Sequence, residues 1–159
     1  MTTREDIQEY IKEQKCNRDI RYLVVHCTAS VPKTKATVEV IDRWHKNRGF
    51  RRQHSGHYCG YHFVIAQDGT IEIGRALCEI GASVQGFNTN LIGIAYAGGL
   101  AANGVPADTR TPEQKDALIF LLKELRKRFP DAWILGHRDF EGVNKACPCF
   151  DAKEEYKDI

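Results

Sequence analysis

The order of apolar and polar residues along the chain predicts strands that alternate with helices. Apolar residues recur four positions apart over residues 4–13, which indicates a short amphipathic helix. Residues 19–26 hold a run of β-branched and aromatic residues too short for a free-standing helix, so we expect a buried central strand ending at His26. A helical apolar face over residues 38–45, with Gly49 as a C-terminal stop, predicts a helix packed on the sheet.

The middle of the chain predicts a β-hairpin. Residues 61–66 and 70–75 are both rich in strand-forming residues, and the Asp68-Gly69 pair between them is a strong turn signal. The polar, glycine-containing segment 50–60 reads as a loop before this hairpin, and the apolar segment 91–99 predicts a further strand.

The clearest helix signal begins at Thr111. The sequence Thr-Pro-Glu-Gln supplies an N-cap, a proline at the first helical position and a capping-box glutamine, and an apolar face follows as far as Phe129. A short strand over residues 132–136 and a final helix near Asp151 complete the pattern. Since hairpins are antiparallel and strand–helix alternation favours parallel pairing, we expect a single α/β (mixed α+β) domain, with a central mixed sheet flanked by helices.

Length and charge narrow the classes of function. The chain has 159 residues and a formal net charge of +2, so it is long enough for one buried core and carries no broad basic field for nucleic acid. Its charged start lacks the apolar core of an export signal, and no run approaches the ~18 apolar residues of a membrane helix. We therefore expect synthesis in the cytoplasm and no membrane insertion.

Six cysteines occur in this chain without an export signal. Under those conditions thiols or metal ligands are more common than a disulfide framework. The cysteines are Cys16, Cys27, Cys59, Cys78, Cys147 and Cys149.

Two histidines and one of these cysteines stand where a metal site is plausible. His26 and His137 each end a predicted strand, and Cys147 comes from the loop after the second. Two imidazoles and one thiolate are a known zinc set, and three protein ligands leave a fourth position open for catalysis. Taken singly, each residue is more often buried packing or a hydrogen-bonded core group, so the spacing alone leaves both interpretations open.

Seven segments in order carry a resemblance to a known family: VVHCTAS, IDRWHKNRGF, GYHFVIAQDGTIEIGR, GFNTNLIGIAYAGG, TPEQKDAL, GHRDF and KACPCFD. Together they resemble the zinc-dependent N-acetylmuramoyl-L-alanine amidases of the type 2 amidase family, which includes phage amidase-type lysozymes and catalytic peptidoglycan recognition proteins. The match runs from about Tyr22 to Asp151. It implies the fold of that family, with an N-terminal helical extension over residues 1–20 and a catalytic domain over 21–159.

The resemblance also implies roles for individual residues. The zinc ligands fall on His26, His137 and Cys147, with one Zn²⁺ for each chain. Tyr61 and Lys145 match the tyrosine and lysine that phage members place beside the metal. A lysine ammonium there would stabilise the developing oxyanion, and a tyrosine hydroxyl would orient water or pass a proton to the leaving amine, although the two roles are exchangeable.

Other residues border the implied substrate groove. Thr28 follows a ligand closely, Asn88 and Asn90 precede the strand at Leu91, and His57 lies in the 50–60 loop. We expect these four to contact substrate. His62 follows Tyr61 and by strand alternation faces away, so we expect it to be structural. The chain departs from phage members at Ser83 and Thr89, where they often carry histidines, which leaves the stem-peptide preference open.

The resemblance implies hydrolysis of the amide between the lactyl group of N-acetylmuramic acid and L-alanine of the peptidoglycan stem, in phage or prophage endolysin-like lysis of the wall. Without the resemblance, the candidate residues indicate only metal-assisted hydrolysis of a carbonyl compound. A non-catalytic peptidoglycan-binding or partner-regulating module on the same fold, and zinc chemistry on another amide or ester, stay open. We expect a monomer that acts on peptidoglycan or muropeptides and reaches the wall through a holin or another delivery system, with a further protein partner possible.

Overall fold

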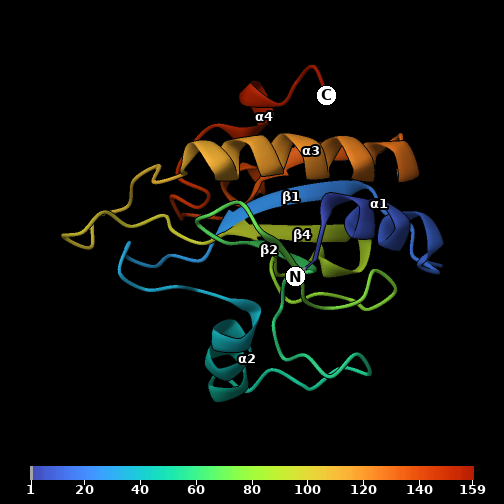
Figure 1. Cartoon of the computed structure of the whole chain (residues 1–159), viewed down its shortest axis with the longest axis horizontal. Helices are drawn as coiled ribbons and strands as arrows, with labels where there is room; N and C mark the ends of the chain where they lie inside the picture. Colours follow the sequence, from blue (N-terminus) through green and yellow to red (C-terminus); the bar gives the residue numbers. More distant parts are fainter. Residues whose placement is uncertain (1) are drawn as a thin grey trace.

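Five strands form one mixed sheet, in the order β3-β2-β4-β1-β5, in the computed structural model of the chain, which describes residues 2–159 (Figure 1). The β2–β3 pair is antiparallel, whereas β2–β4, β4–β1 and β1–β5 are parallel. The predicted mixed sheet is therefore confirmed. The strands are β1 (Tyr22–Cys27), β2 (Phe63–Ile65), β3 (Ile71–Ile73), β4 (Leu91–Tyr96) and β5 (Trp133–Gly136).

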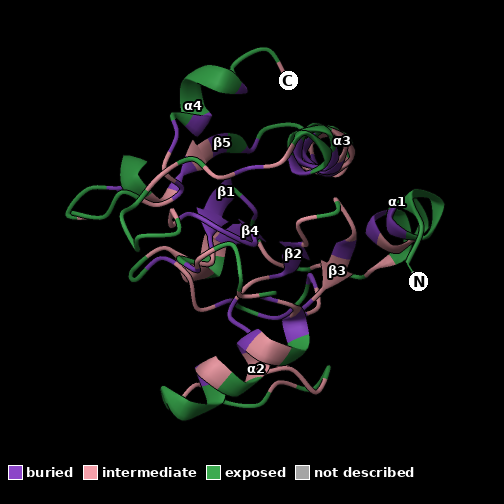
Figure 2. Cartoon of the chain, turned by 60° about the vertical axis from the view of Figure 1, so that its left-hand side comes forward, coloured by how far each residue is buried: buried purple, intermediate pink, exposed green. Residues whose placement is uncertain are grey.

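Helices cover both faces of this sheet (Figures 1 and 2). On one face α3 runs along the sheet beside α1, and α4 packs near β5, while α2 lies on the opposite face. The helices are α1 (Arg4–Glu13), α2 (Val38–Asn47), α3 (Pro112–Arg128) and α4 (Ala152–Glu155), with short 3₁₀ turns η1 (Asn88–Asn90) and η2 (His137–Asp139). Within the described residues, no helix is both long and apolar enough to cross a membrane.

Local sequence signals explain where several elements begin. The Thr111 side chain accepts a hydrogen bond from the Gln114 N–H, and the Gln114 side chain accepts one from the Thr111 N–H, so the predicted capping box of α3 is present. Gly69 has φ +88° in the turn between β2 and β3, where a residue with a side chain would be strained. The predicted helix stop at Gly49 also has a positive φ, of 89°.

The main core fills the face that α1 and α3 cover. Leu23 and Val25 of β1 point into it and are fully buried, together with Leu121 of α3 and Ile7 of α1. Val24 and His26, which alternate with Leu23 and Val25 along β1, point to the other face, where α2 packs, because side chains alternate along a strand. The alternation of β1 therefore sends His26 away from the apolar core.

Two predicted strand boundaries are wrong, for identifiable reasons. The strand expected over 91–99 ends at Tyr96, because Gly98 and Gly99 have φ values of 146° and 96° that leave extended geometry. The strand expected to end at His26 continues through Cys27, which pairs with Tyr96 of β4. His26 thus stays close to the carboxyl end of β1, as the sequence suggested.

The N-terminal helix is part of the packed structure. Ile7 and Ile11 of α1 are buried in the main core. The guanidinium of Arg128 at the end of α3 donates hydrogen bonds to the carbonyl oxygens of Ile11 and, at 2.6 Å, Gln14. The proposed boundary between an extension over 1–20 and a catalytic domain over 21–159 stays a prediction.

Candidate metal centre and substrate pocket

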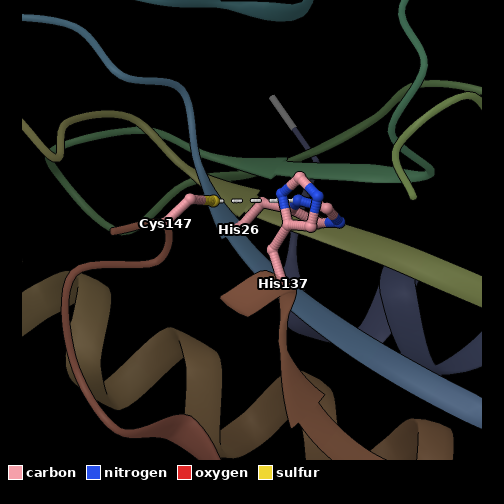
Figure 3. A group of neighbouring side chains, drawn as sticks. All are labelled: His26, His137 and Cys147. Atoms are coloured by element: carbon pink, nitrogen blue, oxygen red, sulfur yellow. Dashed lines mark hydrogen bonds between the residues drawn. The ribbon is translucent and has the colours of Figure 1, made fainter. Parts of the chain in front are cut away.

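Three side chains that are distant in sequence meet at one end of the sheet (Figure 3). One ligand atom each from His26, His137 and Cys147 lies within 4.8 Å of the other two. The Cys147 Sγ atom is 3.9 Å from Nδ1 of His26, and the two imidazole rings have centroids 4.7 Å apart. The structure thus brings the three predicted ligands together.

The parallel pairing of β1 and β5 explains this convergence. Parallel neighbours end at the same edge of a sheet, so His26 near the end of β1 lies beside His137, which directly follows β5. The next turn is held by Asp139, whose carboxylate accepts a hydrogen bond of 2.7 Å from the Gly136 N–H. Both imidazoles are therefore carried by backbone that the sheet fixes.

Hydrogen bonds also hold the loop that carries Cys147 against the sheet. The Arg138 N–H donates to the carbonyl oxygen of Cys147 at 3.0 Å. The buried Tyr96 hydroxyl donates to the carbonyl oxygen of Pro148 at 2.6 Å. These contacts fix the backbone on both sides of the Cys147 α-carbon, so the direction of its thiol is set by β4 and η2.

The electrostatic environment favours the protonation states that bind metals. Burial, followed by the positive charges of His137 and Lys145, lowers the pKa of His26 well below its usual value. Burial also lowers the pKa of His137. A hydrogen bond from the Cys27 thiol, and another from the Cys27 peptide N–H, lower the pKa of Cys147 against the opposing effect of burial. Neutral imidazoles and a favoured thiolate result.

These three residues fit a zinc ion. Zinc binds imidazole nitrogen and thiolate sulfur at about 2.0–2.3 Å, which places tetrahedral ligands about 3.5 Å from one another. The 3.9 Å between His26 and Cys147 is close to that separation. The donor set of two nitrogens and one sulfur is also one that zinc accepts, with a fourth position left for water or substrate.

A pocket of about 760 Å³ opens above the three ligands. Tyr61 lies inside it, with its ring centroid 5.2 Å from that of His26, and Lys145 lines it from the loop before Cys147. Burial, and next the charge of Cys147, raise the pKa of Tyr61, so its hydroxyl stays protonated. A neutral hydroxyl and a cation thus face the same space as the proposed metal ligands.

Two of the four residues expected to contact substrate line the pocket, and two do not. Thr28 and Asn88 line the pocket. Asn90 and His57 are not among the lining residues: the Asn90 side chain donates to the Asp19 carbonyl oxygen at 2.9 Å, and His57 Nδ1 lies 2.8 Å from the Asp42 carboxylate. These two contacts hold the side chains of Asn90 and His57 against other segments of the protein. The sequence could not reveal them, because each joins residues that are not close in sequence.

His62 occupies a structural position, as its strand alternation suggested. Its side chain is fully buried. Nδ1 accepts a hydrogen bond of 3.0 Å from the Gly93 N–H, and Nε2 lies 2.8 Å from the Glu79 carbonyl oxygen. Both ring nitrogens are therefore used to join backbone segments.

Several other residues line the pocket for which the sequence predicted no functional role. Trp44 and His45 line it from α2, Arg48 lines it from the residue after that helix, and Glu141 lines it from the loop after η2. His45 accepts a hydrogen bond of 2.7 Å from the Gly60 N–H, and burial lowers its pKa to about 4, so its imidazole is neutral. The helical pattern placed Trp44 and His45 on the inward face of α2, but such a pattern does not distinguish a core from a pocket wall.

The six cysteines are all free thiols in the structure, as expected. Cys149 follows Cys147 at two residues and has a φ of 71°, which is uncommon for a residue with a side chain. Its thiol donates to the Gly99 carbonyl oxygen at 3.4 Å. Cys149 is not one of the three converging ligands.

Comparisons with known proteins agree with this geometry. Residues 16–150 match the family model described as N-acetylmuramoyl-L-alanine amidase (Amidase_2). The endolysin of Enterobacteria phage K11 is 39% identical over 133 residues, which cover 84% of this chain and 83% of that protein. The endolysin of Klebsiella phage KP32 is 38% identical over 149 residues, with 91% and 88% covered.

A solved structure shows the same architecture. The N-acetylmuramoyl-L-alanine amidase LysC from Clostridium intestinale URNW superimposes with a TM-score of 0.70 at 29% identity, over 89% of this chain and 85% of that one. Residues 16–150, which match the family model, contain all five strands and the three converging ligands. This chain belongs to the Amidase_2 family of N-acetylmuramoyl-L-alanine amidases.

Proposed function

We propose that the protein is an endolysin-like, zinc-dependent N-acetylmuramoyl-L-alanine amidase that hydrolyses the amide between the lactyl group of N-acetylmuramic acid and L-alanine of the stem peptide. The observation that carries this proposal is the meeting of His26, His137 and Cys147 below the pocket. The family match over residues 16–150 supports the bond that is cut. The phage endolysins among its relatives support a role in lysis of the cell wall.

The proposed ligands are Nδ1 or Nε2 of the two histidines and the Cys147 thiolate. A zinc ion bound by them supplies a Lewis acid that polarises a carbonyl group and lowers the pKa of a water molecule to roughly 7. The environment described above supports this role, since neutral imidazoles need not lose a proton to bind and a lowered pKa makes the Cys147 thiol easier to deprotonate.

Tyr61 and Lys145 are the proposed catalytic residues. Lys145 carries a positive charge into the pocket, where it stabilises negative charge on the carbonyl oxygen of the scissile amide. Tyr61 keeps its proton, because burial raises the pKa of its hydroxyl, and it therefore donates a hydrogen bond to the leaving nitrogen or to the attacking water. These are the roles that a neutral donor and a cation perform best.

Thr28 and Asn88 are proposed to orient the substrate from the pocket wall. The Thr28 hydroxyl bonds Ser30 Oγ at 2.7 Å and accepts from the Gly98 N–H at 3.0 Å, so it is rigidly placed. Asn88 Oδ1 accepts from the N–H groups of Ser83 and Val84, both at 2.9 Å, which leaves its amide NH₂ group for other partners. Both positions support contact with the sugar–peptide junction.

The test uses purified peptidoglycan, the zinc-loaded protein, and a parallel reaction with a chelator. New amino groups and new reducing sugar ends are both measured, and the new amino terminus is identified. An amidase releases amino groups that depend on the metal, with alanine as the new terminus and no reducing ends. The Cys147→Ser variant is expected to lose this activity, because an alcohol replaces the thiolate ligand.

Other outcomes would reject the proposal in different ways. New reducing ends would indicate cleavage of the glycan instead. A new terminus other than alanine would indicate a peptidase. Binding of zinc and peptidoglycan without any cleavage would favour a non-catalytic binding module.

A further inference from the structure

Two buried polar atoms beside the proposed metal site have no hydrogen-bond partner within the described residues. They are Nε2 of His26 and Oγ of Ser83. Buried polar groups in folded proteins are nearly always paired, so each such atom calls for an explanation. Their occurrence on the same face of the sheet suggests one explanation for both.

Both atoms lie close to Gly93 of β4. A Cβ atom built on Gly93 would lie 3.0 Å from Ser83 Oγ and 3.8 Å from His26 Nε2. A glycine inside a strand often marks a place where other groups approach the backbone closely. The absence of a side chain at residue 93 thus lets the Ser83 hydroxyl reach the sheet next to the outer nitrogen of His26.

The backbone of Ser83 is fixed in this position. Its N–H donates a hydrogen bond of 2.9 Å to Oδ1 of Asn88, which also accepts from Val84. The Ser83 hydroxyl is therefore presented by a braced turn, and only the rotation of its side chain is left free.

The chemistry of imidazole connects Ser83 to the metal. Nδ1 of His26 is the nitrogen that faces Cys147, at 3.9 Å, so it is the nitrogen placed to bind zinc. A neutral imidazole that binds metal through Nδ1 carries its proton on Nε2, and that N–H needs an acceptor. Metal-binding histidines almost always donate their second N–H to a nearby oxygen.

We propose that Ser83 is a positioning residue for His26. Its hydroxyl oxygen accepts a hydrogen bond from the Nε2–H group, directly or through one buried water molecule, and so keeps Nδ1 directed at the metal. This inference rests on the proposed zinc site, but it does not depend on which bond the enzyme cuts.

The experiment measures the zinc dissociation constant by competition with a chromophoric chelator. Removal of a group that orients a metal ligand typically weakens binding about 10- to 100-fold, and we expect a loss in that range for Ser83→Ala. Ser55→Ala is the matched control, because its hydroxyl bonds Glu79 at 2.6 Å in a loop outside the pocket. Urea unfolding of each zinc-free variant checks that the fold is intact.

Gly93→Ala provides an independent variant. Its Cβ atom would lie 3.0 Å from Ser83 Oγ and would displace the hydroxyl, so zinc binding should weaken as in Ser83→Ala. The double variant should bind no more weakly than the weaker single variant, because both changes remove the same interaction. If the losses of zinc affinity in the two single variants add up in the double variant, the two substitutions do not act through the same interaction.

Nuclear magnetic resonance of the His26 ring gives a readout that a general loss of stability would not mimic. In the zinc-loaded wild-type protein we expect the proton on Nε2, protected from exchange with water, and in Ser83→Ala we expect that proton to exchange measurably faster. Equal zinc affinity and equal exchange in both proteins would overturn the role of Ser83 and leave the zinc site standing. A wild-type protein that binds no zinc would overturn both proposals.

Discussion

The two faces of the sheet differ in composition although the same strands build both. Toward α1 and α3, β1 presents Leu23 and Val25 to a dry apolar core. Toward α2, the alternate residues of β1 include His26, which reaches the pocket. One face thus holds the largest apolar cluster of the described residues, whereas the other combines smaller apolar clusters with the pocket. The alternation of strand side chains keeps the residues of the two faces separate.

The largest expected change in stability comes from the core that α1 and α3 cover. Leu121 of α3 is fully buried, so Leu121→Ala should lower the free energy of unfolding by about 2–5 kcal/mol, as measured by urea denaturation. Ile119 on the same helix is 40% exposed, and Ile119→Ala should cost much less. Below its unfolding temperature the Leu121 variant should bind zinc normally. Weak zinc binding in its folded state would mean that the two faces are not independent.

A substitution in the pocket should show the opposite pattern. Lys145→Met removes a cation that lines the pocket and that we propose stabilises the scissile carbonyl, so kcat should fall about 10²-fold or more, while zinc affinity and unfolding free energy stay near wild type. Steady-state kinetics on purified peptidoglycan measure the change. Lys153→Met, an exposed lysine of α4, is the control. Unchanged kcat in Lys145→Met would remove Lys145 from the proposed catalytic residues.

Tyr96 links the two faces and should give the smallest effect. Its ring is buried in the main core, while its hydroxyl holds the Pro148 carbonyl next to Cys147. Tyr96→Phe leaves that carbonyl buried without its donor, which should cost about 1–3 kcal/mol of stability and also weaken zinc binding. The same two assays test it against Tyr22→Phe, since the Tyr22 hydroxyl makes no hydrogen bond within the described residues. A loss of stability with unchanged zinc affinity would mean that Tyr96 contributes only to core packing and does not help to position Cys147.

Local signals allowed much of the fold to be predicted. Thr111 and Gln114 form the capping box that their spacing indicates, and Gly69 turns the hairpin. These features depend on residues within a few positions of each other. The metal centre could be proposed because His26 and His137 each end a strand predicted from the sequence and because seven motifs resemble a family, but residue spacing alone did not establish it.

The contacts between distant segments could not be predicted in the same way. Ser83 and His26 both lie near Gly93 because β4 is beside β1 and because Gly93 leaves space there. His57 and Asn90 looked like groove residues, yet each side chain bonds a partner outside the pocket. Such partners are chosen by three-dimensional packing, and a single sequence carries no direct record of it.

The separation of the ligands along the chain has a consequence for how the protein matures. His26 and Cys147 are 121 residues apart and are brought together by the sheet and by the hydrogen bonds that hold the Cys147 loop against it, so an unfolded chain has no preformed ligand set. A zinc ion held by the proposed ligands would therefore bind the folded state selectively and would stabilise it, by about 2.7 kcal/mol when free zinc exceeds its dissociation constant 100-fold. Availability of metal in the producing cell would then govern how much of the newly made protein survives proteolysis.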